Sequence, residues 1–305
     1  MPQTEQLFLN EDHVRAALSY EELIPAVRQA LMDYSAGRVQ QPLRMVMPVG
    51  SGVGWFALMP AVYGGLMGAK LVTFFPGNAA RGRHTHNAMI QLFRADTGEP
   101  LAVMDGRLIT EMRTAAVSAV AIEHLASRDA KVLAILGSGV QARSHLRALS
   151  VLRTFEQVRV WSRTQDNAKA FADETGAQLF ATAEEAVRGA DVILTLTSAA
   201  EPVLLGKWLK TTAMVCAIGA VTPERRELDS ETMRGAVVVE SREAGMREPG
   251  DILLATAEIA AEIGELLNGA TLDPQSRPVV FKSVGIAIED IAAARLVYEK
   301  TIAKA

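Results

Sequence analysis

The chain has 305 residues, of which 49% are hydrophobic, and its formal net charge is -4 from 31 basic and 35 acidic residues. This length leaves room for two domains with buried cores, and the slightly acidic balance excludes the basic surface of a nucleic-acid-binding protein. Cys216, the single cysteine, lies in an apolar segment and is expected to be a small core residue. It cannot form an intrachain disulfide, so nothing indicates an oxidising compartment.

Residues 45–69 form an uncharged stretch that is long enough to raise the question of a membrane span. The stretch contains two prolines and six glycines, which make a poor continuous helix, and only helices or closed barrels span lipid. We therefore expect buried strands and turns here, and no membrane partner. Residues 1–6 lack the basic start and apolar run of a signal peptide, so we expect a cytoplasmic location.

The first third of the chain predicts helices followed by a mostly antiparallel sheet. Asn10 is placed to cap a first helix and Ser19 a second, with Glu22 at the position of a capping box. The pattern then changes to short apolar runs, and Asp96-Thr97-Gly98 is typical of a hairpin turn. The strands are expected at residues 45–47, 55–59, 70–75, 87–93 and 101–104.

From Lys131 onward, apolar strands alternate with helices. This alternation predicts an α/β fold, a Rossmann-type doubly wound parallel sheet with helices on both faces. A last helix is expected over residues 286–304, beyond the sheet in sequence. The strands are expected at residues 132–136, 158–161, 178–181, 191–197, 214–218 and 237–239, and the helices at 141–152, 166–173 and 183–187.

The segment Gly137-Ser138-Gly139-Val140-Gln141-Ala142 fits the dinucleotide-binding pattern G-x-G-x-x-A. It follows an apolar strand and precedes an amphipathic helix, which is the context that the pattern requires. Gly137 permits a tight turn, Gly139 lets the backbone approach a pyrophosphate, and Ala142 lets the helix pack closely on the strand. The free N–H groups at the start of the helix attract phosphate. The alternative interpretation is an ordinary glycine turn.

The end of the second strand bears on which dinucleotide binds. NAD enzymes usually have an acidic residue there to hold the ribose 2′-hydroxyl, whereas this sequence runs Trp161-Ser162-Arg163-Thr164. Arg163 and the two hydroxyls would attract a 2′-phosphate, which a carboxylate would repel. We therefore expect NADP (NADPH), and keep NAD as the alternative cofactor.

Several segments, in order along nearly the whole chain, resemble the ornithine cyclodeaminase/mu-crystallin family. They are residues 68–72, 97–106, 113–119, 139–142, 201–204, 226–229 and 281–285. The resemblance implies an NADP-binding Rossmann domain over residues 114–285. This domain would be inserted into an α+β substrate-binding and dimerisation domain made of residues 1–113 and 286–305. It also implies a homodimer and a small imino-acid or amino-acid substrate.

The resemblance also implies a site. Arg44, Lys70 and Arg113 would hold the substrate carboxylate, while Thr85 and His86 would line the place where substrate and cofactor meet. Arg44 and Lys70 are expected on buried strands, and the alternative interpretation of each is a structural charge paired within the protein. Arg113 is expected at a strand-to-helix junction, where its guanidinium can bind a carboxylate bidentately. Three cations in one apolar pocket would repel each other until an anionic ligand binds. The implied cofactor contacts are Arg113, Thr114, Gly137, Ser138, Gly139, Val140, Gln141, Ser162, Arg163, Thr164, Thr195, Thr197, Gly219, Lys282, Ser283 and Gly285.

The sequence departs from the cyclodeaminases at two acidic positions. Where these enzymes have a Glu before Leu-Met-Pro and an Asp in a G-x-D-x-P pattern, this chain has Ala57 and Val221. Neither side chain can accept a proton or anchor the distal ammonium of ornithine. Reduction of a cyclic imine requires less, because NADPH delivers hydride to a protonated C=N group. Lys70 would donate or relay the proton if neighbouring arginines lower its pKa.

The expected function is therefore NADPH-dependent reduction of a cyclic imino acid, Δ1-pyrroline-2-carboxylate or a related ketimine. Two alternatives stay within the family: an NAD(P)-dependent ornithine cyclodeaminase and an amino-acid dehydrogenase. A third, from another class, is a non-enzymatic protein that binds NADPH and a small ligand. No metal is expected, because His84 and His86 supply two ligands where a site needs more.

Overall fold

The computed structural model describes residues 6–273 and 278–303. The chain divides into two compact units: residues 1–114 with 286–305 form unit 1, and residues 115–285 form unit 2. Each unit contains one β-sheet, and the mixed α/β architecture confirms the predicted fold class. Helix α3 (Arg107–Leu125) crosses the boundary between the units in the sequence.

Two helices follow a short first strand in unit 1, and the positions of their caps match the prediction. Asn10 caps α1 (Glu11–Ala17), and its side chain accepts a hydrogen bond from the backbone N–H of His13 at 3.1 Å. Ser19 stands at the cap position of α2 (Tyr20–Ser35), but its side chain bonds no backbone N–H. The hydroxyl instead donates to the Glu22 carboxylate at 3.0 Å, so only the position of this cap was predicted correctly.

The sheet of unit 1 has six strands in the order β1-β6-β5-β4-β3-β2. All neighbours are antiparallel except β1 and β6, which confirms the mostly antiparallel prediction. The three-residue strand β1 was not predicted, since it is too short to show a period. The strands are β1 (Leu7–Leu9), β2 (Met45–Val49), β3 (Gly54–Tyr63), β4 (Leu66–Phe74), β5 (His86–Arg94) and β6 (Pro100–Asp105), with a 3₁₀ helix η1 (Pro76–Arg81) before β5.

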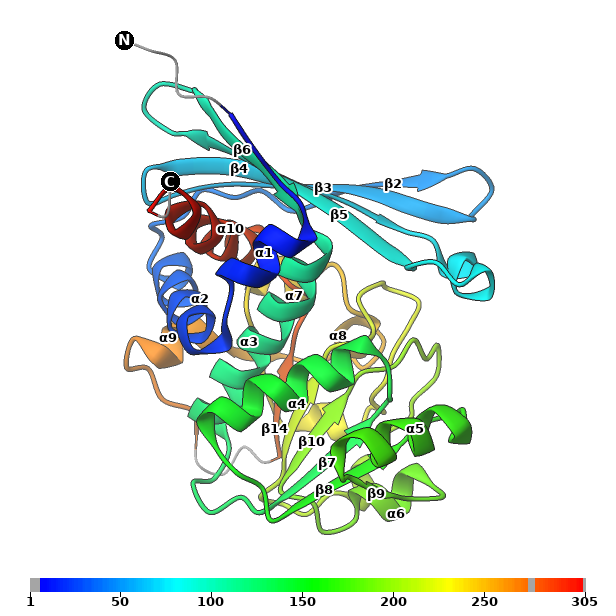
Figure 1. The fold of residues 1–305 in the computed structure, drawn as a ribbon. Coiled ribbons are helices and arrows are strands. Elements are labelled where there is room, and N and C mark those ends of the chain that lie inside the picture. The colour runs from blue at the N-terminus through cyan, green and yellow to red at the C-terminus, as the bar shows by residue number, and fades with distance from the viewer. Residues whose placement is uncertain (1–5, 274–277, 304–305) are drawn as a thin grey trace. The chain divides into compact units, whose positions relative to one another are not determined.

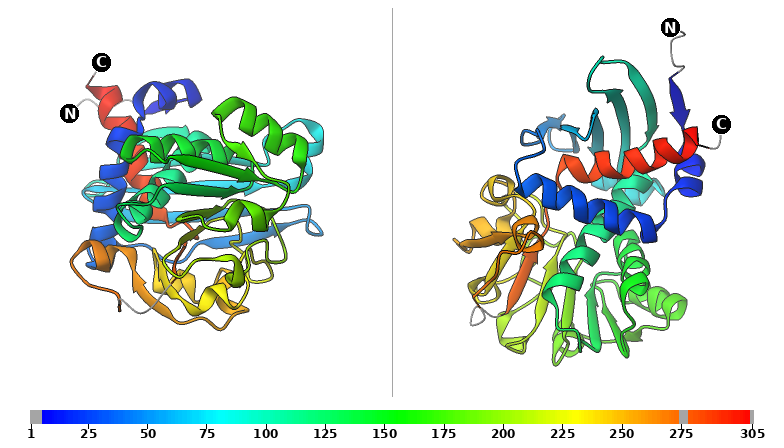
Figure 2. Two further views of the ribbon diagram at one scale, coloured as in Figure 1. Left: turned by 90° about the horizontal axis from the view of Figure 1, so that it is seen from below. Right: turned by 90° about the vertical axis from the view of Figure 1, so that its left-hand side faces the viewer.

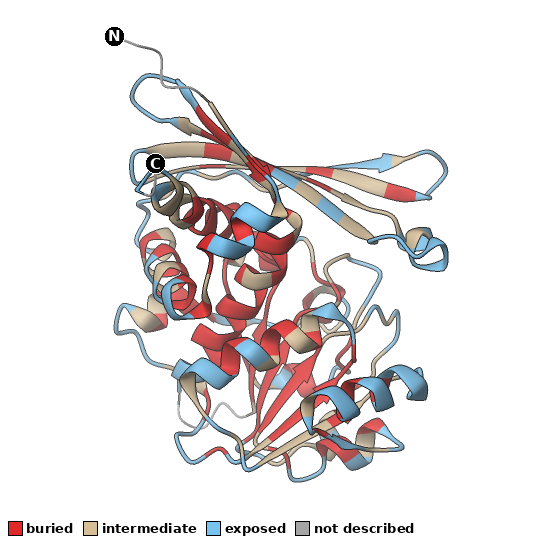
Figure 3. Ribbon diagram, viewed as in Figure 1, coloured by how far each residue is buried: buried red, intermediate tan, exposed pale blue. Residues whose placement is uncertain are grey.

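Helix α10 (Ala287–Ile302) packs on one face of this sheet, against β3, β4 and β5, and against α2. Figures 1 and 2 show it crossing the strands in the part of unit 1 where burial is deepest (Figure 3). A side chain at Gly68 would lie 2.9 Å from Ile291 Cδ1 and 2.4 Å from the carbonyl oxygen of Gln91. Glycine is therefore needed at this position for the helix to approach β4 so closely.

Strand β2 corrects the expectation that the uncharged stretch is buried throughout. Met45, Val46 and Met47 are 59%, 50% and 48% exposed, and Figure 3 shows this edge of the sheet in the colours of exposed and intermediate residues. The reason is that β2 is an edge strand, with a partner on one side alone. Within residues 6–273 and 278–303, no helix is both long and apolar enough to cross a membrane.

Unit 2 contains an eight-stranded sheet in the order β13-β12-β14-β11-β10-β7-β8-β9, with every neighbouring pair parallel. The predicted strands are all present, but β13 and β14 were not predicted. The strands are β7 (Val132–Leu136), β8 (Gln157–Trp161), β9 (Gln178–Leu179), β10 (Val192–Thr195), β11 (Met214–Ala217), β12 (Ala236–Val239), β13 (Ile259–Glu262) and β14 (Val279–Lys282).

The helices of unit 2 lie between these strands in sequence. The predicted start of one of them was one residue late: α5 begins at Gln165 after its cap Thr164, and Asp166 lies in its first turn, where an acid favours the helix dipole. The helices are α4 (Val140–Leu152), α5 (Gln165–Thr175), α6 (Ala183–Val187), α7 (Arg242–Gly245), α8 (Gly250–Leu253) and α9 (Ile263–Leu267), with 3₁₀ helices η2 (Gly206–Trp208) and η3 (Thr232–Arg234).

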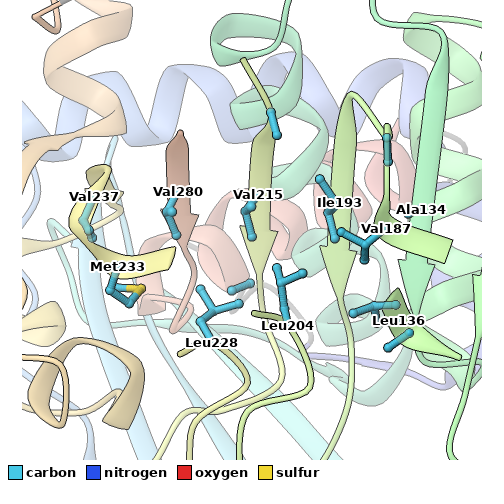
Figure 4. Close-up of a cluster of buried hydrophobic side chains, with 14 of the residues drawn as sticks. Ala134, Leu136, Val187, Ile193, Leu204, Val215, Leu228, Met233, Val237 and Val280 are labelled. Atoms are coloured by element: carbon cyan, nitrogen blue, oxygen red, sulfur yellow. The ribbon is translucent and has the colours of Figure 1, made fainter. Parts of the chain in front are cut away.

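The topology of the parallel sheet predicts where a ligand binds. Strands β8 and β9 lie on one side of β7 and β10 lies on the other, so the order reverses between β7 and β10. Ligands of open α/β sheets bind beyond the carboxyl ends of the strands at such a switch point. Ile193, Val215, Val280 and Val237 pair across four neighbouring strands and are fully buried (Figure 4), which fixes the register of those strand ends.

Candidate active site

Lys70 lies in the middle of β4 on the face that α10 covers, and its side chain is 1% exposed. The register places it between Met59 of β3 and Ile90 of β5, both buried. Its Nζ forms an ion pair with Oδ2 of Asp290 at 2.7 Å. The pKa of Lys70 is lowered to about 8: burial is the largest cause, the nearby Arg113 charge acts in the same direction, and Asp290 opposes both. We predicted a lowered pKa from neighbouring arginines, but desolvation is the larger cause.

Arg113 does not lie at a strand-to-helix junction, as we predicted, but inside α3. The helix begins directly after Gly106, whose backbone carbonyl accepts the Thr110 N–H at 2.9 Å, so the helix has already started before Arg113. The Arg113 side chain is 7% exposed. Its Nε donates to Oδ1 of Asp290 at 3.0 Å, and its Nη1 donates to the Glu289 carboxylate.

Asp290 and Glu289 are the residues of this site that sequence reasoning missed. Both are fully buried near the start of α10, and together they pair with Arg113 and Lys70. The expectation that the cations lie unpaired in an apolar pocket is therefore wrong for these two. Two adjacent acids in an otherwise apolar helix were the available signal, because a buried carboxylate requires a cationic partner.

Arg44 and His86 complete the charged cluster of unit 1. Arg44 immediately precedes β2 and is half-buried, so the prediction that it projects from a buried strand is wrong. Its charge nevertheless lowers the pKa of Lys70, which places Arg44 within electrostatic range of that lysine. His86 begins β5, and burial, followed by the Lys70 and Arg113 charges, lowers its pKa to about 4. His86 is therefore neutral at pH 7.

Thr85 is half-buried next to His86, and its carbonyl oxygen accepts the Phe75 N–H at 2.8 Å. His84 is exposed, with its carbonyl bonded to Asn78 at 2.9 Å. The described part of the chain contains no group of three or more histidine, cysteine or acidic side chains that could hold a metal ion.

In unit 2, the glycine loop has the shape that a pyrophosphate requires. Gly137 has φ = +121°, and a side chain there would lie 2.5 Å from the carbonyl oxygen of Leu196. A side chain at Gly139 would meet nothing within 4 Å, and Gly139 caps α4 without any side-chain hydrogen bond to the helix. Within α4, Oε1 of Gln141 is buried and has no hydrogen-bond partner. An open face beside unpaired polar groups fits a bound dinucleotide.

The segment expected to select the dinucleotide follows β8. Arg163 and Thr164 are exposed and Ser162 is half-buried, and Gln165 donates to the Ser162 carbonyl at 3.3 Å. Within residues 6–273 and 278–303, no hydrogen bond or ion pair engages the Arg163 guanidinium, so it is available to a ligand at the end of this strand. No carboxylate stands in this segment.

Three of the predicted cofactor contacts converge on a buried acid. Glu227 is fully buried and accepts hydrogen bonds from the hydroxyls of Thr195 (2.8 Å) and Thr197 (2.7 Å). It also accepts from the backbone N–H groups of Thr197 (2.6 Å) and Gly219 (2.7 Å). Burial raises the pKa of Glu227. This acid fixes the ends of β10 and β11, and sequence reasoning had not singled it out as a site residue.

The remaining predicted contacts of the strand ends are likewise held by acids. Nζ of Lys282 pairs with Oδ2 of Asp251 at 3.0 Å, and both side chains are fully buried. Glu240 accepts from the Ser283 hydroxyl and from the Gly285 N–H at 3.3 Å. These residues therefore shape the carboxyl edge of the sheet, and their contact with a cofactor stays a prediction.

A doubly wound sheet with an open glycine loop, together with a buried lysine–arginine cluster in the other unit, defines a nicotinamide-dinucleotide-dependent oxidoreductase. The particular family follows from its sequence. The chain belongs to the ornithine cyclodeaminase/mu-crystallin family, whose pattern matches residues 4–305.

Similar proteins resemble the chain over almost its whole length. A ketimine reductase mu-crystallin of Mus musculus is 44% identical over 95% of this chain and 94% of its own length. A Δ1-pyrroline-2-carboxylate reductase of Bacillus cereus is 36% identical over 97% of both chains. Among solved structures, the Thermococcus litoralis Δ1-pyrroline-2-carboxylate reductase in complex with NADH and L-proline has a TM-score of 0.92 at 35% identity, covering 98% of both chains.

Proposed function

We propose that this protein reduces a cyclic imino acid, Δ1-pyrroline-2-carboxylate or a related ketimine, to the cyclic amino acid with NADPH. The observation that carries the proposal is the buried Lys70, whose pKa lies near 8 beside Arg113 and Arg44. Similar proteins named ketimine reductase and Δ1-pyrroline-2-carboxylate reductase support the reaction class.

The charge balance of the cluster favours an anionic substrate. Arg44, Lys70 and Arg113 carry three positive charges when the lysine is protonated, and Glu289 and Asp290 carry two negative charges. One positive charge is left over, and the carboxylate of an imino acid would neutralise it. We assign the substrate carboxylate to Arg44 and Arg113, because a guanidinium binds a carboxylate bidentately.

The proton comes from Lys70. Its ammonium transfers a proton to the imine nitrogen and becomes a neutral amine. Protonation of the imine makes the ring carbon of the C=N group electrophilic. A bound reduced nicotinamide supplies a hydride, with its electron pair, to that carbon, and the C=N π pair becomes the nitrogen lone pair. The neutral lysine then regains a proton from water. Burial excludes water from the lysine during the transfer.

The neighbourhood of Lys70 argues against deamination of ornithine. Ala57 pairs with Val72, and Val72 lies two residues from Lys70 on the same face of β4, so this part of the face carries small apolar side chains. Neither Ala57 nor Val221 can act as a base or bind a distal ammonium. An amino-acid dehydrogenase remains the second candidate, because an archaeal alanine dehydrogenase with bound NAD has a TM-score of 0.92 at 31% identity.

The exposed Arg163, in a segment over residues 161–164 that contains no acid, supports NADPH as the preferred cofactor. A guanidinium forms charge-assisted hydrogen bonds to a 2′-phosphate, which NADH lacks. The cofactor contacts assigned to the glycine loop, to Thr114 and to the ends of β10, β11 and β14 belong to the same proposal.

A homodimer is supported by the face of the unit 1 sheet that lies opposite α10. Met45, Leu58, Leu71 and Met89 are paired across four strands and so share this face. Met45 is 59% and Met89 is 49% exposed, which leaves a large apolar surface uncovered. A second copy of the chain would cover it, and the mass of the protein in solution tests this.

An assay of NADPH oxidation tests the function. The purified protein is given a panel of cyclic imino acids and, separately, α-keto acids with ammonia. We expect rapid oxidation with a five- or six-membered cyclic imino acid, and no release of ammonia from ornithine with NAD or NADP. Rapid turnover of the keto acids with ammonia, and none of the imines, would favour the dehydrogenase. Tight NADPH binding without any turnover would favour a binding protein.

A further inference from the structure

Asp290 contacts both cations that face the substrate from the centre of unit 1. Oδ2 lies 2.7 Å from Nζ of Lys70, and Oδ1 accepts from Nε of Arg113 at 3.0 Å. The carboxyl group is fully buried. One carboxylate therefore bridges the proposed proton donor on β4 and the proposed carboxylate ligand on α3.

Its neighbour Glu289 makes a useful contrast. Glu289 is equally buried and pairs with Arg113, whereas Asp290 is the acid that raises the pKa of Lys70. The titratable groups around Lys70 are Asp290 and Glu289 on α10, Arg113 on α3, Arg44 before β2 and His86 on β5. His86 is neutral at pH 7, so the two arginines disfavour the lysine proton while Asp290 favours it.

We infer that Asp290 is a positioning residue that keeps Lys70 protonated and aligned for proton donation near neutral pH, an inference that rests on the proposed function. Without this carboxylate, burial and the two arginines would act unopposed on the ammonium. After the lysine has donated its proton, Asp290 remains a carboxylate and still accepts an N–H bond from the neutral amine. The lysine therefore keeps its place until water returns the proton.

The ion pair between Lys70 and Asp290 also explains why the pKa of Lys70 is not much lower. Buried lysines without an acidic partner reach pKa values of about 5–6, and such a lysine would be deprotonated at pH 7. The pKa of Lys70 stays near 8, because Asp290 raises it against burial and Arg113. At neutral pH most of the lysine is then available as a donor.

The test is the pH dependence of kcat for imine reduction. Activity should fall as the pH rises through the pKa of Lys70, near 8 in the unaltered protein. In Asp290→Asn this fall should move to lower pH by about one to two units, because removal of an adjacent opposite charge has an effect of that size. In Glu289→Gln the fall should stay in place, while KM for the imino acid rises because Arg113 has lost one of its partners.

Two further variants keep the test decisive. Asp290→Glu retains the charge, so the fall should stay near its original pH while kcat drops because the lysine is displaced. This variant also serves if Asp290→Asn does not fold. Glu299→Gln, on the exposed side of the same helix where Glu299 pairs with Arg295, should change neither parameter.

The inference is overturned if Asp290→Asn folds and its kcat falls at the original pH, or if Asp290→Glu shifts the profile as much as Asp290→Asn does. The assignment of Lys70 as the donor fails separately if Lys70→Met retains the same alkaline fall as the unaltered protein, because the titrating group is then not Lys70. The proposed function itself fails if the unaltered protein reduces none of the cyclic imino acids.

Discussion

Replacing Lys70 with methionine removes the proposed proton donor and keeps an unbranched side chain that is one atom shorter. With a pKa of about 8, roughly nine-tenths of the lysine is protonated at pH 7. In the unaltered protein, Lys70 is therefore able to donate a proton in almost every molecule at pH 7. A positioned general acid contributes about 10²–10⁴-fold to a rate, and we expect kcat to fall by about that factor.

The same replacement has a structural cost that the assay must separate from the catalytic one. Breaking a buried ion pair outright costs ~3–5 kcal/mol. Asp290 would still accept from Arg113 at 3.0 Å, so we expect a smaller loss of unfolding free energy. Thermal unfolding of the variant, alone and with NADPH, shows whether the fold and the cofactor site survive. Lys169→Met removes an exposed lysine paired with Asp173 and serves as the control.

Steady-state kinetics across pH then decide the role of Lys70. We expect a large loss in kcat, a much smaller change in KM, and no alkaline fall in the pH profile, because a proton donor acts in the transition state. A folded Lys70→Met protein with near-normal kcat would refute the assignment and leave Lys70 as an electrostatic anchor.

Three other predictions concern the cofactor, the carboxylate and the dimer. Arg163→Ala should weaken NADPH binding by roughly ten- to a hundredfold, the value of a charge-assisted hydrogen bond, and barely affect NADH; titration with each cofactor checks this, and an equal loss for both would contradict it. Arg44→Ala should raise KM for the imino acid at nearly unchanged kcat. Arg113→Ala should also lower the thermal stability, because it leaves Glu289 and Asp290 short of a buried partner. An unfolding temperature of Arg113→Ala equal to that of the unaltered protein would contradict this pairing. Met89→Glu places a charge on the apolar face of the sheet and should convert a dimer to a monomer in light scattering, while a dimer that persists would point to another interface.

The local parts of the fold were predictable from the sequence, because their signals lie within a few residues. Gly137 and Gly139 stand between an apolar strand and a helix, and that context alone identifies the loop. The position of β14 was not predictable in this way. It lies between β11 and β12 in the sheet although it follows both in sequence, and no local pattern encodes such an order.

Some residues of the candidate site were likewise predictable from the sequence, and others were not. Lys70 and Arg113 came from the resemblance, and the structure brings both into one cluster with Asp290. The acids themselves were missed because their partners are far away: Asp290 lies 177 positions from Arg113 in the sequence. Exposure was misjudged at Met45, since an uncharged run does not reveal whether its strand will lie at an edge.

The origin of these acids in α10 has a consequence for how the protein is made. Unit 2 is one continuous segment, residues 115–285, and all of it is synthesised before Glu289 and Asp290. Contacts within a continuous segment can form as soon as that segment emerges. Until α10 arrives, however, Lys70 and Arg113 lack both acidic partners, and burying them would be costly. The sheet of unit 1 is therefore expected to stay open to water until α10 is made, and a released chain truncated after Gly285 should show a protease-resistant unit 2 beside a cleavable unit 1.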